Sequence, residues 1–521
     1  MYKNLKSLGT IFIAVSLVFG LLIRVFVVLY FTNFSGDQIN DAYRVMGTWE
    51  GSPPTLGPGP AAWSGLSGEI YLPPLYYYLV FPFTVFTHDL SSQAIPNAFF
   101  TFLSIPLLSI VVYKLIENIN SQKRYIIAAL AGIWYSFLFR NIVFSTGDSL
   151  AGNPVSIPFF MLCFILLYTY QLEGKLSPRV EILSWIAYGI CLAILVSLHF
   201  SALFVMPVIF ICTLVFYICR NPKRIKRWFL SGVAIVSALL VLTPYWIGEV
   251  GRSWINTRTI ISLVIDASSK KGHAVTFLQR LDQASRGYLD LGKDVYFISY
   301  SSLIIAVSIA FLFIVLVLGL IKFKGNKTIL GLFLATWIVF LYAYSSTNLD
   351  ITYNPVFYKV LIYLAPIVLT SCSLAYLNFA KKLDKVFIGL ILLGIILSML
   401  INIKYHYNYV SARSGMPRLA NTSDIAHMLN QVPEKSIICD PIARYRNIRI
   451  YEYTDRYITK KQFKFVPECK PGSYLFYKKY ESLGNFTKRS TKSFSEAFKE
   501  FDKKYSLFKD TPFYYIYRLD D

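Results

Sequence analysis

The stretch that decides the topology of this 521-residue chain is Leu72–Thr87, which reads LPPLYYYLVFPFTVFT. It is apolar, but it is shorter than the roughly 20 residues that a transmembrane helix needs. It also opens with Pro73-Pro74 and contains Pro82, and proline removes a backbone donor and breaks helices. We therefore predict a re-entrant or interfacial segment on the outer side of the membrane. The side on which every later loop lies follows from that choice.

The composition of the chain is that of a polytopic membrane protein. Hydrophobic residues make up 55% of it and charged residues only 15%, with a mean hydropathy of +0.50. A soluble globular protein carries roughly 25% charged residues. These values exclude a disordered, collagen-like or disulfide-scaffold protein and argue against an ordinary cytosolic enzyme. The formal net charge of +22 would suggest a nucleic-acid partner in a soluble protein, so the positions of the cations matter.

Eleven apolar runs are predicted as membrane spans, and most of the basic residues up to position 403 lie between them. The runs are residues 8–31, 94–116, 125–144, 154–172, 181–198, 200–219, 228–247, 296–321, 328–345, 357–379 and 385–403. Compact basic clusters occupy the short loops at 114–124, 175–179, 220–227, 322–327 and 381–385. With 72–87 on the outer side, all five clusters face the cytoplasm, as the positive-inside rule expects. We predict a multi-pass plasma (inner) membrane protein with a cytoplasmic N-terminus, embedded in the lipid bilayer and without a nucleic-acid partner.

Two domains follow from this topology. Residues 1–403 form an all-α transmembrane domain with two large external loops, 32–93 and 248–295. Residues 404–521 form an external tail in which helix signals alternate with strand-like runs, a pattern that suggests a small α/β domain. The helix signals are 422–430 and 493–501, and the strand-like runs are 436–439, 473–477 and 513–517.

The cysteines carry little functional information. Five of the seven lie in the predicted spans, where they behave as small hydrophobic residues. The other two, Cys439 and Cys469, lie in the tail. An oxidising compartment would allow a disulfide between them, although the sequence cannot test the geometry.

Polar residues on the predicted outer face are the candidates for function. Asp37 follows the first span directly, so it would lie at the outer membrane boundary, where ionisable groups are functional candidates. It could instead cap the helix that starts near Gln38. Asp41 comes four residues later on the same helix face, where it adds a second acid or serves as a cap.

The rest of the first external loop is rich in Pro, Gly and Trp and carries Glu69 and Tyr71 just before the stretch at 72–87. Long loops of this kind are functional or disordered, and the aromatic content argues against disorder. Tyr76–Tyr78 could form nothing more than an interfacial aromatic belt, and we expect this of at least two of them.

Further polar residues occur in the other predicted outer segments. Asp148 lies in a loop that could be an ordinary turn, and His199 lies between two apolar runs, where a lone histidine is more often structural. Arg258 and Arg280 belong to a cationic loop that suits an anionic head group but could equally be a solvated face. Lys359, near the outer end of the tenth span, could snorkel or hold a lipid phosphate.

Several well-known catalytic motifs are missing from the sequence. It contains no P-loop, dinucleotide-binding fingerprint, HExxH, GxSxG or Cys/His metal spacing. ATP-driven transport and zinc proteolysis are therefore unsupported. We predict no definite cofactor. The isolated acids leave a divalent metal open, without a ligand cluster to hold it.

Together these features resemble the GT-C membrane glycosyltransferases, in particular the bacterial branch related to protein O-mannosyltransferases and the lipid A aminoarabinose transferase. The similarity covers roughly residues 5–400, mostly as topology. Leu72-Pro73-Pro74-Leu75-Tyr76-Tyr77 resembles the family's (Lys/His)-Pro-Pro-Leu-Tyr-Tyr stretch. The other similar segments are Phe34–Tyr43, His199–Pro207 and Tyr358–Pro366.

The resemblance implies a polyprenyl-phosphate-sugar donor on the outer leaflet and a glycan, lipid or protein acceptor. Asp37 matches the family's catalytic Asp and would be the general base for an inverting, in-line attack on the anomeric carbon. Arg258 and Lys359, with Arg280 behind them, would neutralise the lipid-phosphate leaving group. The expected substrate-binding residues are Asp41, Glu69, Tyr71, Asp148, His199, Arg258, Arg280 and Lys359.

The sequence departs from the family at two positions. Gln38 stands where relatives often have an acid, and Leu72 stands where they often have Lys or His.

Two other functions remain open. A transporter or flippase of lipid-linked saccharides should show an inverted repeat and paired discontinuous helices, and neither is evident. A non-catalytic envelope assembly protein would act through the tail and would tolerate Asp37→Asn.

Overall fold

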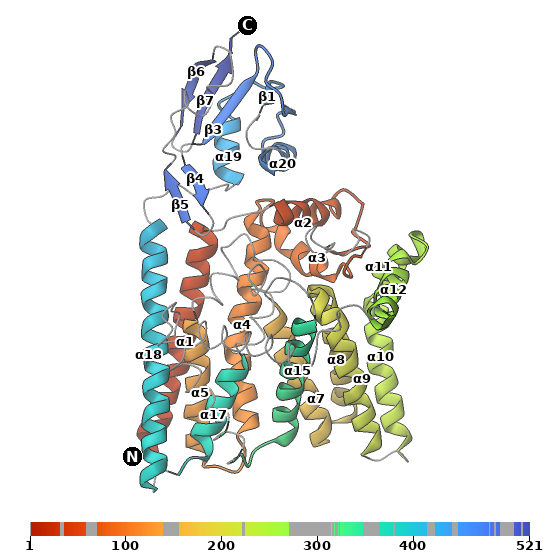
Figure 1. Cartoon of the computed structure of the whole chain (residues 1–521), viewed down its shortest axis with the longest axis vertical. Helices are drawn as coiled ribbons and strands as arrows, with labels where there is room; N and C mark the ends of the chain where they lie inside the picture. Colours follow the sequence, from red (N-terminus) through yellow and green to blue (C-terminus); the bar gives the residue numbers. More distant parts are fainter. Residues whose placement is uncertain are drawn as a thin grey trace.

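The computed structural model consists of a long helical bundle with a small sheet at the C-terminal end of the chain (Figure 1). It describes residues 2–31, 36–58, 70–138, 156–220, 224–269, 323–346, 364–378, 381–413, 422–439, 446–478, 480–483, 486–489, 505–511 and 514–520, with the single positions 314, 317 and 321. We call the end of the bundle nearer the sheet the upper end, and the end that holds the N-terminus the lower end.

Most of the predicted apolar runs form helices of the bundle. They are α1 (Tyr2–Phe31), α4 (Ser91–Leu115), α5 (Ser121–Phe137), α7 (Ile157–Glu173), α8 (Pro178–Leu198), α9 (Phe200–Cys219), α10 (Ile225–Val241), α15 (Lys327–Ser346), α17 (Leu364–Tyr376) and α18 (Lys382–Arg413). The buried apolar side chains of these helices, α1 excepted, form one continuous core, and Val28 of α1 packs in a smaller cluster with Ala94 and Ala98 of α4. Large apolar side chains such as Leu22, Leu240 and Leu393 are exposed on the outside of the bundle, which is the surface that a protein in lipid presents.

The helices have the dimensions of an integral membrane protein. Within the described ranges, four are long and apolar enough to cross a bilayer: Ser7–Leu29, Ala94–Leu115, Pro178–Leu198 and Lys382–Asn408. A bent pair, α10 with α11 (Thr243–Gly251), would be a fifth span. Several other apolar helices are shorter, and the run predicted at 296–321 lies almost wholly outside the described residues. The structure therefore supports a polytopic membrane protein and leaves the predicted count of eleven spans unconfirmed.

One predicted span is not a single helix. The run at 228–247 is broken at Leu242, where α10 and α11 meet at an angle of 55°. Pro244 lies in the first turn of α11, a position that proline favours because the missing N–H is not needed there. The predicted span is bent because this proline ends the first helix and starts the second.

The stretch at 72–87 does not form a long helix. It folds into the short helix α3 (Leu75–Val80) and the 3₁₀ turn η1 (Phe81–Val85). Pro82 lies at the start of η1, as expected from a residue that cannot continue an α-helix. At 11 residues together, these two elements fall short of the roughly 20 residues of a spanning helix.

The C-terminal part of the chain contains the small sheet that the tail pattern predicts. Its five strands lie in the order β2-β1-β3-β7-β6, with β1 parallel to β2 and β3 and the remaining pairs antiparallel. A separate hairpin, β4 with β5, lies near the upper end of α18. The strands are β1 (Ile437–Cys439), β2 (Lys464–Val466), β3 (Tyr474–Lys478), β4 (Tyr480–Leu483), β5 (Phe486–Arg489), β6 (Tyr505–Asp510) and β7 (Tyr514–Leu519).

The helices of this part are α19 (Thr422–Leu429) and α20 (Arg446–Thr454), which continues into the π-helical turn η3 (Asp455–Thr459). The helix predicted at 422–430 is therefore present, as are the strands predicted at 436–439, 473–477 and 513–517. The helix predicted at 493–501 lies outside the described residues. We use the name C-terminal domain for residues 422–520.

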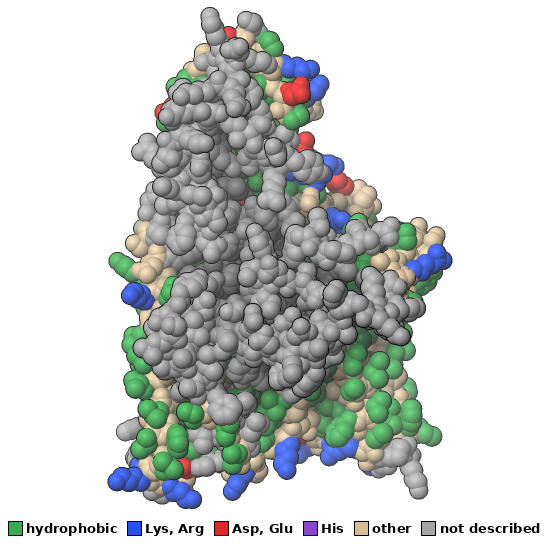
Figure 2. Space-filling view, in the orientation of Figure 1, with side chains coloured by type: hydrophobic (Ala, Val, Ile, Leu, Met, Phe, Trp, Pro, Cys, Tyr) green, Lys and Arg blue, Asp and Glu red, His purple; other side chains and the backbone are tan. Residues whose placement is uncertain are grey.

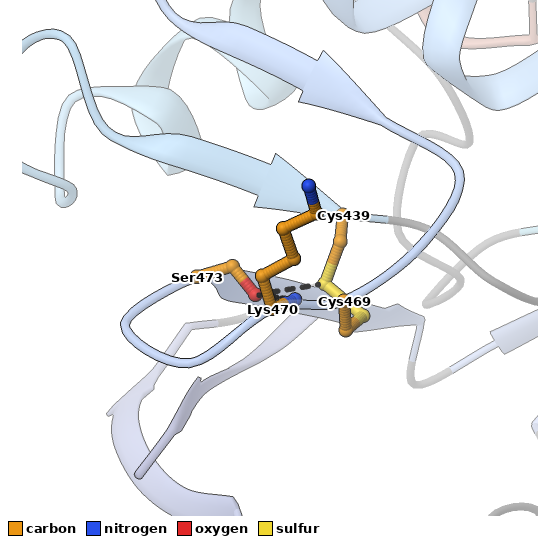
Figure 3. The surroundings of a disulfide bond; sticks show 4 residues. All are labelled: Cys439, Cys469, Lys470 and Ser473. Carbon is orange, nitrogen blue, oxygen red and sulfur yellow. Dashed lines mark hydrogen bonds between the residues drawn. A yellow bond between two sulfur atoms is a disulfide. The ribbon is translucent and has the colours of Figure 1, made fainter. Parts of the chain in front are cut away.

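A disulfide joins Cys439 at the end of β1 to Cys469 in the loop before β3 (Figure 3). The buried hydroxyl of Ser473 lies beside it: Oγ accepts from the N–H of Lys470 at 3.1 Å and donates to Sγ of Cys439 at 3.4 Å. The possible pairing of the two tail cysteines is thus present in the structure. It fixes the loop between β2 and β3 to strand β1.

Candidate active site

The helix that carries the predicted catalytic residue lies at the upper end of the bundle, beneath the C-terminal domain (Figure 1). This helix, α2, runs from Gly36 to Gly47. Asp37 therefore lies within the first turn of α2. The capping interpretation required it to precede the helix. Asp41 follows one turn later, on the same side of the helix.

A buried tyrosine fixes Asp41. The hydroxyl of Tyr77, in α3, donates a hydrogen bond to Oδ1 of Asp41 at 2.7 Å, and the tyrosine side chain is 1% exposed. Burial, and then the charge of Asp41, raises the pKa of Tyr77 well above its ordinary value. The phenol therefore remains a hydrogen-bond donor to Asp41 at any ordinary pH.

The three tyrosines after the proline pair do not form an interfacial belt. Tyr76 and Tyr77 are buried in the bundle core. Tyr78 is half-buried, and its hydroxyl donates to the carbonyl of Pro54 at 2.7 Å. The expectation of an aromatic belt was wrong because α3 packs Tyr76 and Tyr77 into the core of the bundle, and Tyr78 is bonded to the first loop.

Two arginines gather around Tyr71, just before α3. The guanidinium carbon of Arg252 lies 4.8 Å from the centroid of the Tyr71 ring. That of Arg44, on α2, lies 5.6 Å from the same centroid and 6.0 Å from that of Tyr77. Both are within the range of cation–π contact. The arrangement concentrates positive charge beside the helix that carries Asp37 and Asp41.

Hydrogen bonds to backbone groups hold Arg44 and Tyr71 in place. Nη1 of Arg44 donates to the carbonyl of Gly57 at 2.7 Å. The buried side chain of Asn256, near the start of α12 (Ile255–Ser269), accepts from the N–H of Tyr71 at 2.6 Å and donates to its carbonyl at 2.8 Å. Tyr71 is thus bonded at both backbone groups, which connects the second long loop to the first.

Gly57 has a steric reason to be glycine. Its N–H donates to the carbonyl of Leu72 at 2.7 Å. A Cβ at position 57 would lie 2.3 Å from the carbonyl oxygen of Pro73 and 2.7 Å from that of Leu72. Only a residue without a side chain can bring the loop backbone this close to the proline pair.

The remaining predicted site residues are placed less centrally or lie beyond the described ranges. Arg258 is exposed on α12, and His199 is half-buried at the turn between α8 and α9. Glu69, Asp148, Arg280 and Lys359 lie outside the described residues, as does the side chain of Asp37. Their assignments stay predictions.

Four residues of this cluster were not chosen as site residues from the sequence. Arg44 is three residues after Asp41, so helical spacing could have placed it on the carboxylate face. Tyr77 was part of a recognised motif but was expected at the interface. Asn256 belongs to the polar run Asn256-Thr257-Arg258, from which only Arg258 was chosen. Arg252 carries no local signal that distinguishes it from other residues of its loop, because only the folding of 248–269 against residue 71 reveals it.

Among the residues that the structure describes, no group of three or more His, Cys, Asp or Glu side chains is arranged to hold a metal ion. Asp41 is the described acid nearest to Tyr77, and one of its oxygens is engaged by that phenol. We therefore derive no step of the chemistry through a metal.

Comparison with known proteins gives structural similarities only. No protein-family model and no curated protein sequence matches the chain. The solved structures similar to it include the oligosaccharyltransferase AglB from Archaeoglobus fulgidus, in complex with an inhibitory peptide and a dolichol-phosphate. That pair has 13% identity and a TM-score of 0.45, over 86% of this chain and 64% of AglB. ArnT from Cupriavidus metallidurans, in the apo state, has 10% identity and a TM-score of 0.39, over 98% of this chain and 97% of ArnT.

Both similar proteins are GT-C membrane glycosyltransferases. This chain spans just under two thirds of the length of the archaeal enzyme, at 64%, and nearly the whole length of ArnT, at 97%.

Proposed function

We propose that this protein is a GT-C membrane glycosyltransferase that moves a sugar from a polyprenyl-phosphate donor to an acceptor hydroxyl on the outer face of the membrane. The observation that carries the proposal is the cluster at the upper end of the bundle. There, a helix bearing two aspartates lies beside two arginines and a buried tyrosine. A carboxylate base next to concentrated positive charge suits a reaction that takes up a proton and releases a phosphate.

The two aspartates have different roles in this scheme. Asp41 already accepts a hydrogen bond from Tyr77, and a hydrogen bond to the ionised form makes a carboxylate a weaker base. Asp37, one turn earlier, is therefore the proposed general base. It takes the proton of the acceptor hydroxyl while the acceptor oxygen bonds to the anomeric carbon. The bond from that carbon to the phosphate oxygen breaks, and its electron pair leaves with the lipid phosphate, so the configuration inverts.

The arginines near Tyr71 suit the leaving group. Arg44 and Arg252 lie over the same aromatic ring, so a phosphate beside that ring meets two positive charges. The sequence favoured Arg258 for this role, but its side chain is exposed on α12. We therefore propose Arg252 as the principal phosphate ligand from this loop. Arg280 and Lys359 remain candidates for the same function.

The distribution of charge supports the proposed orientation. Lys and Arg side chains gather at the lower end of the bundle (Figure 2), where the cytoplasmic side of a membrane protein carries its cations. On this basis the lower end is cytoplasmic, and the aspartate helix and the C-terminal domain are external. The outer leaflet is then the source of the donor, and the acceptor can be a glycan, a lipid or a protein.

The proposal is tested by transfer of a labelled sugar from a synthetic polyprenyl-phosphate donor. The purified wild-type protein is compared with Asp37→Asn. We expect loss of at least about 100-fold in rate, the usual contribution of a general base. Glu434→Gln, which removes one charge from an exposed turn of the C-terminal domain, should transfer at the wild-type rate. Equal rates for Asp37→Asn and wild type would remove Asp37 from the mechanism, and an unaltered cellular function would favour a non-catalytic assembly role.

A further inference from the structure

Helix α2 is shared between two hydrophobic cores. Val45 packs in the core of the helical bundle together with Tyr77. Ile39, Ala42 and Met46, each 1% exposed, pack instead in the core of the C-terminal domain. Half of the helix that carries the two aspartates is thus built into a domain whose sequence lies nearly 400 residues away.

Polar contacts reinforce this attachment along one side of α2. Nη1 of Arg449, on α20, donates to Oδ1 of Asn40 at 2.7 Å. The hydroxyl of Tyr43 donates back to the carbonyl of Arg449 at 3.2 Å. The ring of Tyr43 also meets that of Tyr453 edge to face, with centroids 5.4 Å apart. These contacts fix the rotation of α2 about its own axis as well as its distance from α20.

A second set of contacts holds the segments that follow α2 and η1. Arg456 forms an ion pair with Glu50 at 2.7 Å, and the hydroxyl of Tyr457 donates to Oε1 of the same Glu50 at 3.0 Å. The hydroxyl of Tyr453 donates to the carbonyl of His88 at 2.8 Å. The C-terminal domain therefore contacts the chain just beyond the ends of α2, at Glu50, and of η1, at His88.

The opposite side of α2 faces the candidate active site around Tyr71 and Tyr77. Asp41 is bonded to Tyr77 there, and Arg44 lies over the rings of Tyr71 and Tyr77. Because α2 packs in the cores of both the helical bundle and the C-terminal domain, a movement of either one moves the helix. Any displacement of the C-terminal domain shifts the carboxylates of α2 relative to the arginines around Tyr71.

We propose that Glu50, Arg449, Arg456 and Tyr457 are positioning residues for the transfer reaction, through which the C-terminal domain sets the position of the α2 carboxylates. This inference rests on the proposed function. It gives the domain a role in the rate of the chemical step, in addition to any contact that it makes with an acceptor. Its physical basis is that misplacing a reacting group by about 1 Å can cost about 100-fold in rate.

The Glu50–Arg456 pair is the best place to test the idea, because changing it should not unfold the protein. Both side chains are partly exposed, at 37% and 57%, and surface ion pairs contribute only about 0–1 kcal/mol to stability. The test uses Glu50→Gln, Arg456→Gln and the swap Glu50→Arg with Arg456→Glu. The matched control is Glu173→Gln, which breaks the ion pair with Lys114, 3.3 Å long, between α4 and α7.

Two measurements are made on the full-length protein. The first is the rate of sugar transfer from the polyprenyl-phosphate donor, separated into kcat and KM. The second is amide hydrogen exchange of residues 36–47, which reports the opening of α2 whether or not the protein is active. We expect each single variant to lower kcat about tenfold at unchanged donor KM and to speed exchange in α2. The charge swap should restore most of both, and the control should change neither.

The outcomes separate the inference from the proposed function. Unchanged exchange in α2 for both single variants overturns the positioning role, whatever the activity. Faster exchange with unchanged kcat also overturns it and leaves the proposed function intact. If the wild-type protein transfers no sugar, the proposed function is wrong, and so is the proposed effect of the C-terminal domain on kcat. Faster exchange with lower kcat, both restored by the swap, supports the inference.

Discussion

At the scale of single residues, one hydrogen bond connects the aspartate helix to the stretch that decides the topology. Tyr77→Phe removes the hydroxyl that donates to Asp41 and keeps the ring in place. The carboxylate then loses a charge-assisted hydrogen bond from a buried phenol. We expect a loss of about 1–3 kcal/mol in the free energy of unfolding, measured by thermal unfolding in detergent.

Tyr78→Phe is the matched control for this change, because it removes a hydroxyl from the neighbouring residue. The lost bond goes to the neutral carbonyl of Pro54, so the expected cost is nearer the roughly 1 kcal/mol of an ordinary hydrogen bond. If Tyr77→Phe is no more destabilising than Tyr78→Phe, the bond to Asp41 does not have the importance that we give it.

Tyr457 gives the attachment of the C-terminal domain a dependence on pH. Burial, and then its hydrogen bond to Glu50, raises the pKa of Tyr457 from 10.0 to about 12. A folded state that holds its proton more tightly is stabilised at every pH below the unfolded pKa, and it loses that stabilisation as pH rises through the folded one. We therefore expect the thermal midpoint of the wild type to fall more steeply between about pH 10 and pH 12 than that of Tyr457→Phe. Parallel curves for the two proteins would contradict this assignment.

The sequence predicted some site residues and not others, for reasons visible at individual positions. Asp37 follows a span directly and Asp41 comes one turn later, so their place on one side of the same helix was accessible from local pattern. Tyr71 was chosen from its position before the proline pair, and the structure places it among the arginines. Arg252 could not be found in this way, because its contact with Tyr71 joins positions 181 residues apart in the chain.

At the scale of elements, the fold of the first loop depends on a close approach of two backbones. Gly57→Ala would place a Cβ 2.3 Å from the carbonyl oxygen of Pro73, so the loop must move away from the start of α3. We expect a loss of about 1–3 kcal/mol in stability, as for other overpacked sites. Transfer activity should fall as well, because Arg44 is bonded to the carbonyl of Gly57.

Gly232→Ala supplies the control. No atom lies within 4 Å of a Cβ added at that position of α10, and alanine favours a helix over glycine by about 1 kcal/mol. Stability should therefore stay equal or rise. If the two alanine variants have the same stability and activity, close packing at Gly57 is not what shapes the loop.

The elements themselves were largely predictable where hydrophobic pattern determines them. The apolar runs within the described residues became helices, and the prolines of 72–87 shortened that stretch to α3 and η1. The sequence did not predict the break at Leu242. The apolar run had the length of a membrane span, and Pro244 alone was not taken as the end of a helix. The start of α2 at Gly36 was also missed, since helix ends are the least certain part of any pattern.

At the scale of the whole molecule, the bundle and the C-terminal domain meet through α2, and the proposed chemistry requires both to be on the outer side at this end. The topology can be tested with single cysteines in a background whose five free cysteines are replaced. Ser506→Cys lies in β6 and Lys382→Cys at the start of α18, and both positions are exposed. In sealed right-side-out vesicles, a membrane-impermeant maleimide should label Ser506→Cys alone.

After detergent has permeabilised the vesicles, Lys382→Cys should be labelled too, which shows that this cysteine is reactive once the reagent can reach it. The result bears on the chemistry, because a polyprenyl-phosphate donor on the outer leaflet meets Asp37 only if α2 is external. Labelling of Lys382→Cys before Ser506→Cys would mean that the whole protein is inverted in the membrane, because α2 and the C-terminal domain lie at the same end of the molecule. The basic loops would then face outward, against the electrostatic preference that normally places them inside, and the donor would have to come from the cytoplasmic leaflet.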